Sequence, residues 1–266
     1  MTTQTSPATD VVTELDSAVL TIALDGPKTR NSISAPVYKE LQSAIIMAGE
    51  NPEIRAIVLT GRHGFFSSGG NINALKASAQ STMAEVTGNT DALNAMIIAI
   101  RSCPTPVIAA VEGGAAGAGL SLALACDMIV ASEEAKFTAA YVKAGLVPDG
   151  GLTSAMARLI PRPLAMEMCL LGRPVMAGRF ADLGAVNRIC GVGRTLGEAM
   201  MLADTLAAGP RAAQGAIRRM VADAFETTEA AQLDAERDAM ARASGADEAA
   251  EGIAAFLEKR PPRFAG

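Results

Sequence analysis

The chain has 266 residues, of which 50% are hydrophobic and 19% are charged, and its formal net charge is −5. This length and composition suit a large α/β domain with a sizeable core and argue against disorder. The negative charge gives no general attraction to nucleic acid or to an anionic membrane. The chain has no tryptophan and two tyrosines, which argues against a stacking surface for single-stranded bases. We therefore expect no nucleic-acid partner and no membrane partner.

The segment 1–10 is polar and lacks the basic and apolar regions of a signal peptide. No uninterrupted apolar run reaches the length of a membrane span. The four cysteines lie far apart and form no CxxC pair, which is typical of free thiols in a reducing compartment. These features predict a cytoplasmic protein.

Between residues 11 and 160, short apolar runs alternate with segments of helical periodicity. The runs rich in β-branched residues are typical of buried parallel strands. The expected strands are 11–15, 19–24, 55–60, 106–111 and 127–131, and the expected helices are 35–49, 91–101, 120–126 and 152–160. This alternation predicts an α/β fold with a mainly parallel sheet.

After about residue 195 the pattern contains helices only. Apolar residues recur there at helical spacing. The residues that share a helical face are Ile217, Met220 and Val221, then Leu233 and Met240, then Ile253, Phe256 and Leu257. Such a helical tail either folds back on the core or packs on a second subunit, and the sequence leaves both open.

Two glycine-rich segments, 65–72 and 113–119, each lie where an expected strand ends. Segments this poor in side chains can present bare backbone N–H groups to a ligand atom. Two such donors that converge on one oxygen form an oxyanion hole, which stabilises a carbonyl oxygen as it becomes negative. The pair of segments therefore predicts chemistry at a carbonyl group.

Other readings of the second glycine-rich segment fit less well. Position 120 is Leu, where a phosphate-binding loop needs Lys. The dinucleotide pattern Gly-x-Gly-x-x-Gly is not satisfied in register. The only histidine, His63, lies in a polar turn, which predicts an exposed loop residue and argues against a histidine-rich metal site. We expect no metal.

Five segments of the chain resemble the crotonase (enoyl-CoA hydratase/isomerase) superfamily. They occur in the family's order over roughly residues 12–262. The segments are Phe-Ser-Ser-Gly-Gly-Asn-Ile at 66–72, the run at 106–127, Ala-Lys-Phe at 135–137, Gly-Leu-Val-Pro-Asp-Gly-Gly at 145–151, and the run at 251–261.

The resemblance implies an α/β fold with a crotonase-like spiral ββα core and a C-terminal helical region used in trimer contacts. It implies an acyl-CoA thioester as substrate, with coenzyme A as part of that substrate and no separate cofactor. We expect an acyl-CoA-binding core at 12–200 and a helical oligomerisation region at 201–266, in a homotrimer or a dimer of trimers.

The resemblance also implies the two oxyanion donors, the backbone N–H groups of Gly70 and Ala118. Ala118 precedes an expected helix, whose dipole favours a negative charge at that end. Gly70 has no Cβ, so a thioester oxygen can approach its backbone closely.

The expected acids differ from those of the hydratases in this superfamily, which use two glutamates. This chain has Ser121 and Tyr141 at those positions, so hydration by two glutamates is disfavoured. Asp149, in Pro-Asp-Gly, is the remaining candidate base, and similar segments occur in family members that shift double bonds. Its alternative role is to cap the helix expected at 152–160. Tyr141 either donates a hydrogen bond or packs, and Ser121 either lines the pocket or holds a water.

The resemblance and the distribution of cations indicate where coenzyme A binds. Cations near its phosphates are expected at both ends of the chain. The expected residues are Lys28, Arg30, Ser32, Ser68, Gly70, Asn71, Ile72, Phe256 and Lys259.

The leading hypothesis is an isomerase of unsaturated acyl-CoA in lipid metabolism, with Asp149 as the proton carrier. The first alternative is an enoyl-CoA hydratase with a non-standard acid–base set. The second is a non-catalytic acyl-CoA-binding homologue that keeps only the oxyanion segments.

Overall fold

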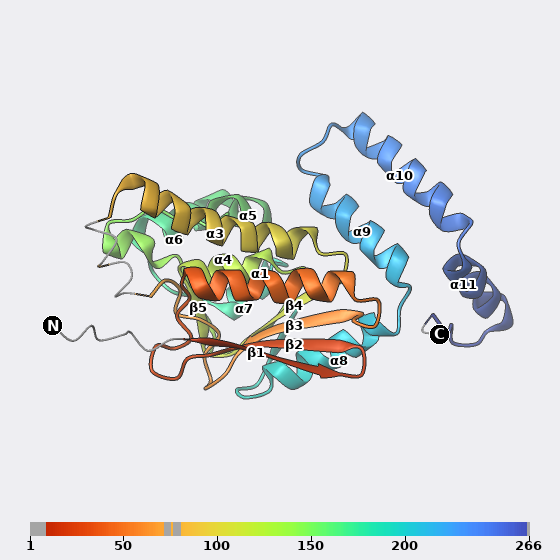
Figure 1. Cartoon of the computed structure of the whole chain (residues 1–266). Helices are drawn as coiled ribbons and strands as arrows, with labels where there is room; N and C mark the ends of the chain where they lie inside the picture. The colour runs from red at the N-terminus through yellow and green to blue at the C-terminus, as the bar shows by residue number, and fades with distance from the viewer. Residues whose placement is uncertain (1–8, 72–75, 77–80, 265–266) are drawn as a thin grey trace.

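The computed structural model describes residues 9–71, 76 and 81–264. Its central sheet has six strands in the order β1-β2-β3-β4-β6-β9 (Figure 1). The β1–β2 pair is antiparallel and the other four pairs are parallel. The strands are β1 (Asp10–Asp16), β2 (Val19–Asp25), β3 (Ala56–Gly61), β4 (Val107–Val111), β6 (Met128–Ser132) and β9 (Arg188–Cys190).

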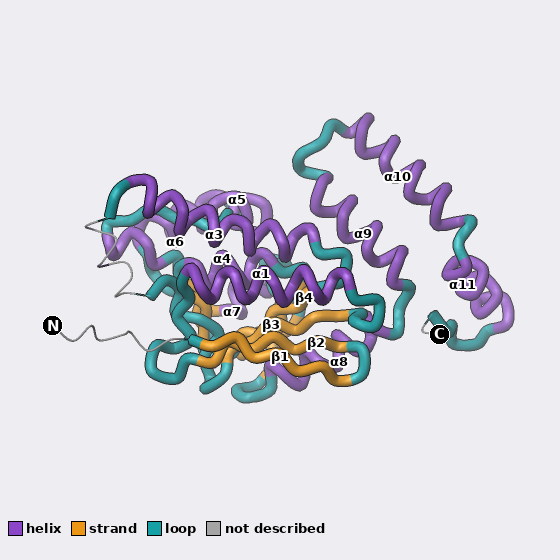
Figure 2. The backbone as a smooth tube through the Cα atoms, viewed as in Figure 1, coloured by secondary structure: helices purple, strands orange, loops and turns teal. Residues whose placement is uncertain are grey.

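Helices cover both faces of this sheet, as Figure 2 shows. In β3, Ile57 and Leu59 join the larger core with α1 (Ala35–Glu50) and α3 (Met83–Ser102), whereas Val58 joins the smaller core with α8 (Thr195–Ala207). Successive residues of a strand point to opposite faces, so a strand covered on both sides is apolar throughout. This explains why β3 and β4 are continuous apolar runs in the sequence.

A second, three-stranded sheet forms the base of the candidate site. Its strands are β5 (Gly114–Ala116), β7 (Lys136–Thr138) and β8 (Val175–Met176), in the order β5-β7-β8. Two isolated parallel bridges continue it, one between Ser67 and Ala115 and one between Ile33 and Gly70. The two glycine-rich segments therefore lie side by side.

Shorter helices connect these strands, and three further helices end the chain. In Figure 1 the last three extend to one side of the core, away from the sheet. The connecting helices are α4 (Ala118–Ala125), the 3₁₀ helix η1 (Ala140–Ala144), α5 (Leu152–Leu159), α6 (Arg162–Leu171) and α7 (Ala177–Asp182). The last three are α9 (Arg211–Asp223), α10 (Glu229–Ser244) and α11 (Asp247–Glu258).

A mostly buried arginine attaches α9 to the core. The side chain of Arg218 is 8% exposed, and its Nε lies 2.5 Å from Oδ2 of Asp127. The Arg218 guanidinium also donates to the carbonyl oxygens of Ile100, Arg101 and Cys103, where α3 ends. Burial raises the pKa of Asp127, and the arginine opposes that shift. The end of α3 is thus satisfied by a side chain from the C-terminal region.

The structure confirms the expected strands and helices, but the helix expected at 91–101 begins too late. This helix, α3, starts at Met83 because Thr82 and Glu85 form a capping box. The Thr82 hydroxyl accepts from the Glu85 N–H, and the Glu85 carboxylate accepts from the Thr82 N–H. His63 is exposed, as predicted. All four cysteines are free, and Cys103 is buried.

Candidate active site

The two glycine-rich segments meet at a backbone-to-backbone contact. The Ala116 N–H donates to the carbonyl oxygen of Ser67 at 3.0 Å. Gly69 has φ +86°, and a Cβ placed on it would lie 2.4 Å from the Ala116 carbonyl oxygen and 3.2 Å from the Ala118 nitrogen. Since no side chain fits there, glycine at position 69 allows the first segment to lie directly against the start of α4.

The two expected oxyanion donors, Gly70 and Ala118, flank this contact. Gly70 pairs with Ile33 in an isolated bridge, but the residues on either side of Gly70 form the hydrogen bonds of that bridge. The Ile33 N–H donates to the Gly69 carbonyl oxygen at 2.8 Å, and the Asn71 N–H donates to the Ile33 carbonyl oxygen at 3.1 Å. Ala118 is the first residue of α4, where backbone N–H groups have no partner within the helix. Neither N–H donates a hydrogen bond within the described part of the chain. Both are available to a ligand oxygen.

Three further expected residues, Asp149, Tyr141 and Ser121, form one hydrogen-bonded cluster. The Tyr141 hydroxyl donates to Oδ1 of Asp149 at 2.8 Å. The Ser121 hydroxyl donates to the Asp149 carbonyl oxygen at 3.0 Å, and it lies 3.2 Å from the Tyr141 hydroxyl. Because Ser121 belongs to α4, whose first residue is Ala118, the cluster is built on the same helix as one expected oxyanion donor.

The Asp149 side chain does not cap α5. The residue at the N-cap of α5 is Gly151, and the helix has no side-chain cap. The carbonyl oxygen of Asp149 accepts from the Leu152 N–H at 3.2 Å, which leaves the carboxylate to Tyr141. The capping alternative for this carboxylate is therefore wrong.

The surroundings of the cluster determine its protonation. Burial raises the pKa of Asp149, and the hydrogen bond from Tyr141 opposes that shift. Burial, followed by the charge of Asp149, raises the pKa of Tyr141 above its usual range. The phenol therefore stays protonated and acts as a donor, whereas the carboxyl titrates closer to neutrality than an exposed aspartate. This arrangement can hold and return one proton.

The residues expected near coenzyme A lie in two places. Ser32, Ser68 and Asn71 lie together by the first glycine-rich segment: Ser68 Oγ donates to Thr29 O at 2.8 Å, and Asn71 Nδ2 donates to Ser32 Oγ at 3.3 Å. Ile72 lies outside the described residues. Two more of the expected residues, Phe256 on α11 and Lys259 at its end, are exposed, and a single chain does not bring α11 to the site (Figure 1).

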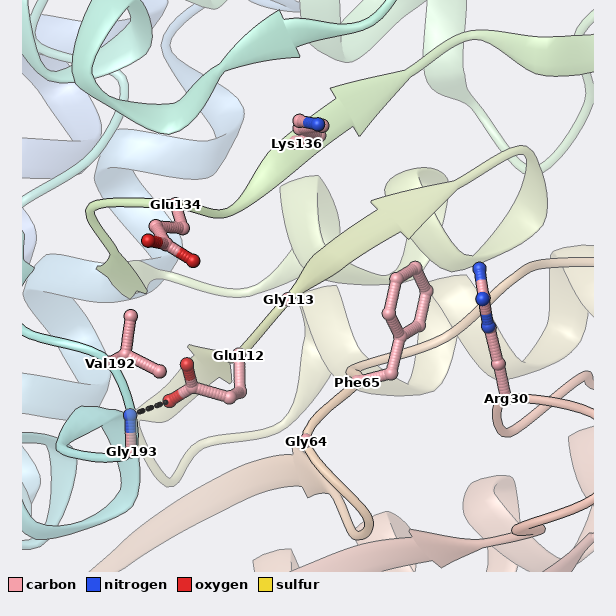
Figure 3. Close-up of a pocket in the computed structure, with 9 residues that line it drawn as sticks. All are labelled: Arg30, Gly64, Phe65, Glu112, Gly113, Glu134, Lys136, Val192 and Gly193. Carbon is pink, nitrogen blue, oxygen red and sulfur yellow. Dashed lines mark hydrogen bonds between the residues drawn. The ribbon is translucent and has the colours of Figure 1, made fainter.

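Lys28 and Arg30 are both exposed between β2 and α1, where the Arg30 carbonyl oxygen accepts from the Ser68 N–H at 2.9 Å. The Arg30 guanidinium lies 5.6 Å from the ring centre of Phe65 and lines a pocket of about 420 Å³. Lys136 of β7 lines the same pocket, together with the carboxylates Glu112 and Glu134 (Figure 3). Arg30 and Lys136 have no ion pair with any described residue, so their charges are available to an anion.

Sequence reasoning missed Lys136 and Tyr38. Lys136 lies on β7 of the three-stranded sheet and lines the same pocket as Arg30. Tyr38 lies on α1, and the charge of Asp149 contributes to its raised pKa. Within the described ranges, no group of three or more His, Cys, Asp or Glu side chains is placed to hold a metal ion. None of the described helices is long and apolar enough to cross a membrane.

Comparison with known proteins places the chain in a family. The sequence matches the model of the family described as Enoyl-CoA hydratase/isomerase over residues 14–266. The 1,2-epoxyphenylacetyl-CoA isomerase of Escherichia coli (strain K12) is 31% identical over 257 residues, covering 96% of this chain and 98% of that protein. A probable enoyl-CoA hydratase of Rhodobacter capsulatus is 35% identical over 253 residues, covering 95% and 96%. The crystal structure of an enoyl-CoA hydratase from Polaromonas sp. JS666 has a TM-score of 0.94 at 39% identity, covering 96% and 99%.

The fold is thus that of the crotonase superfamily, as the sequence motifs predicted. Within that superfamily, the chain belongs to the enoyl-CoA hydratase/isomerase family. Its function lies among the acyl-CoA reactions of that family.

Proposed function

We propose that this enzyme isomerises an unsaturated acyl-CoA, with Asp149 as the group that carries the proton. The position of the Asp149 carboxylate supports this assignment. Tyr141 donates to the carboxylate, and Ser121 donates to the main-chain carbonyl oxygen of the same residue. These are the two positions at which the resemblance to hydratases would require glutamates. One carboxylate is enough for an isomerase, because the proton that is removed is also the proton that is returned.

The reaction proceeds through an enolate. Asp149 removes a proton from carbon 2 of a 3-enoyl-CoA, and the electrons of that C–H bond delocalise toward the thioester oxygen. The N–H groups of Gly70 and Ala118 stabilise the negative oxygen. Asp149 then returns the proton to carbon 4, and the double bond lies between carbons 2 and 3. No water and no cofactor is consumed; coenzyme A is part of the substrate.

Hydration is the second candidate, and the names of several relatives favour it. The relative from Rhodobacter capsulatus is named a probable enoyl-CoA hydratase, and the similar structure from Polaromonas sp. JS666 is that of an enoyl-CoA hydratase. Asp149 with Tyr141, or a water held by Ser121, would then replace the two glutamates. A non-catalytic acyl-CoA-binding protein is the third candidate, since it needs only the oxyanion segments.

One spectroscopic experiment separates the three candidates. An isomerase conjugates a 3-enoyl-CoA and increases the absorbance of the enoyl-thioester band. A hydratase decreases that band when it is given a 2-enoyl-CoA in water. A binding protein changes neither absorbance while it retains acyl-CoA. A decrease with the 2-enoyl substrate and no increase with the 3-enoyl substrate would contradict the proposed isomerase.

We also propose that Lys28 and Arg30 bind the phosphates of coenzyme A. The support is the open pocket beside Arg30, which Lys136 lines as a second cation along with Glu112 and Glu134. Arg30 and Lys136 form no ion pair with these carboxylates. Guanidinium and ammonium groups bind phosphate through charge-assisted hydrogen bonds.

Replacing Arg30 by alanine is expected to lower kcat/KM for acyl-CoA about tenfold, within the range of one charge-assisted hydrogen bond. Acyl-pantetheine, which lacks the nucleotide and its phosphates, serves as the matched control substrate. Steady-state kinetics should show a smaller loss with it. An equal loss with both substrates would place Arg30 away from the phosphates.

The C-terminal helices support an oligomer with an interface at 201–266, separate from the core at 12–200. We propose a cytoplasmic homotrimer or dimer of trimers. Large apolar side chains that are exposed along several helices often mark a contact with another chain. The large hydrophobic residues exposed on α9–α11 and in the α9–α10 connection are Ile217, Val221, Phe225, Leu233, Met240, Ile253, Phe256 and Leu257.

Aspartates at Phe256 and Leu257 together are expected to reduce the assembly to smaller species, because they place charges on an apolar contact. Analytical ultracentrifugation should give three or six chain masses for the wild type and a lower mass for the double variant. An unchanged mass would exclude α11 from the interface.

A further inference from the structure

Ser67 is a fully buried polar residue in the first glycine-rich segment. It is 0% exposed. Its Oγ donates to the Asn31 carbonyl oxygen at 2.8 Å and accepts from the Gly69 N–H at 3.2 Å. A buried hydroxyl that is engaged in both directions holds its two partners in place, because a buried polar group that loses its hydrogen bond is destabilising. Ser67 therefore ties the first glycine-rich segment to the backbone at Asn31.

These contacts determine the direction of the Gly70 N–H. The Gly69 carbonyl group and the Gly70 N–H belong to one peptide unit, and they point in opposite directions because that bond is trans. The Ile33 N–H donates to this carbonyl oxygen at 2.8 Å, and Ser67 Oγ holds the N–H of the same glycine. Since Gly69 is fixed at both its N–H and its carbonyl group, the Gly70 N–H is fixed as well.

Ser67 also lies against the start of α4, whose first residue is the other expected donor, Ala118. A Cβ placed on Gly119, the next residue of α4, would lie 2.7 Å from the Cβ and the carbonyl oxygen of Ser67 and 2.8 Å from its Oγ. Glycine at position 119 allows the helix backbone to contact Ser67 directly. One buried residue thus contacts a neighbour of each expected oxyanion donor.

We propose that Ser67 is a positioning residue that fixes the separation and the direction of the N–H groups of Gly70 and Ala118. Its hydroxyl is engaged by Asn31 and Gly69, so it acts on the reaction through the backbone. An oxyanion hole depends on donors that are in place before the charge develops, and a change in their spacing reduces the stabilisation of the enolate. The inference rests on the proposed function in one respect, namely that both N–H groups donate to the thioester oxygen.

Infrared spectroscopy of a bound, non-reactive acyl-CoA tests this without turnover. Hydrogen bonds to a carbonyl oxygen lower its stretching frequency, so the wild type should lower that of a saturated acyl-CoA labelled isotopically at the thioester carbonyl. Ser67→Ala is expected to reduce this shift and to lower kcat about tenfold, less than the loss of a whole oxyanion donor. The Kd for free coenzyme A, which has no thioester carbonyl, should keep its wild-type value.

Ser132→Ala is the matched control. Ser132 is also 0% exposed, and its Oγ accepts from the Glu134 N–H at 3.3 Å, just as that of Ser67 accepts from the Gly69 N–H. It lies on β6, so this variant also loses a buried hydroxyl but leaves the two glycine-rich segments unchanged. Its carbonyl shift and its kcat should follow those of the wild type.

Gly119→Ala tests the same contact from the side of α4. The added Cβ would meet Ser67 and push the start of the helix away from it. Because alanine is a better helix former than glycine, a reduced carbonyl shift in this variant reports a displaced donor and not a weakened helix.

A wild-type carbonyl shift in Ser67→Ala, or an equal reduction in Ser67→Ala and Ser132→Ala, would overturn the proposal. Where Ser67→Ala does not fold, a wild-type shift in Gly119→Ala would overturn it instead. A wild type that does not lower the carbonyl frequency would overturn the oxyanion assignment and this proposal together. A reduced shift in Ser67→Ala, without isomerisation by the wild type, would support the proposal and overturn the isomerase assignment alone.

Discussion

Replacing Asp149 by asparagine is expected to lower the rate of double-bond migration at least about 10³-fold, because general acid–base catalysis contributes about 10²–10⁴-fold. Asparagine has nearly the same shape but cannot accept the proton. Its amide oxygen can still accept the hydrogen bond from Tyr141, so the local packing is preserved. Stopped-flow absorbance with a 3-enoyl-CoA measures the rate, and calorimetry with a saturated acyl-CoA measures binding.

Acyl-CoA affinity should change little in this variant, since the expected oxyanion donors belong to the backbone of Gly70 and Ala118. A variant that still isomerises at the wild-type rate would show that Asp149 is not the proton carrier. A variant that loses both rate and affinity would instead assign Asp149 a role in holding the site together.

The pH dependence of the same two proteins follows from the raised pKa of Asp149. The base works when deprotonated, so the wild-type rate should fall as pH decreases through a value above 3.8, the ordinary aspartate value. The residual rate of Asp149→Asn should not show this decrease at low pH.

The raised pKa of Asp149 also affects stability. A raised pKa in the folded state favours folding below the unfolded-state pKa, and that contribution is lost as pH rises through the folded-state pKa. Thermal unfolding of the variant should lack this loss.

Much of the site could be predicted because its signals are local. Glycine at 69 and 70 marks backbone that lies close to other backbone, and Pro-Asp-Gly marks a carboxylate at a turn. In the same way, apolar runs of strand length in the sequence predicted the positions of β3 and β4. The structure places Asp149, Tyr141 and Ser121 in one cluster, which the proposed mechanism requires.

The remainder depends on contacts between elements, which periodicity does not encode. Tyr38 is on the buried side of α1, and nothing in the local sequence indicates that the charge of Asp149 acts on it. Lys136 joins Arg30 through the short strand β7, too short to give a strand signal. Asn31 is fully buried, and its side-chain amide holds the start of the first glycine-rich segment by donating to the carbonyl oxygens of Arg62 and Phe65.

Replacing Gly69 by alanine is expected to reduce both stability and activity. The new Cβ would lie 2.4 Å from the Ala116 carbonyl oxygen, and backbone cannot move aside as a flexible side chain does. The first glycine-rich segment must therefore move away from the second, which changes the spacing between the N–H groups of Gly70 and Ala118. We expect kcat to fall about 10²-fold or more, the effect of losing one oxyanion donor. Strain at a positive φ adds about 1–3 kcal/mol of destabilisation.

The variant Gly184→Ala separates the two effects. Gly184 has φ +78°, close to the +86° of Gly69, but a Cβ there would meet no atom within 4 Å. It should show the loss of stability caused by a positive φ and keep its activity, because nothing near the site moves. Thermal unfolding and kinetics of both variants measure the two quantities. Wild-type kcat in Gly69→Ala would mean that the contact between the two segments does not set the rate, and the assignment of Gly70 and Ala118 as oxyanion donors would then be wrong.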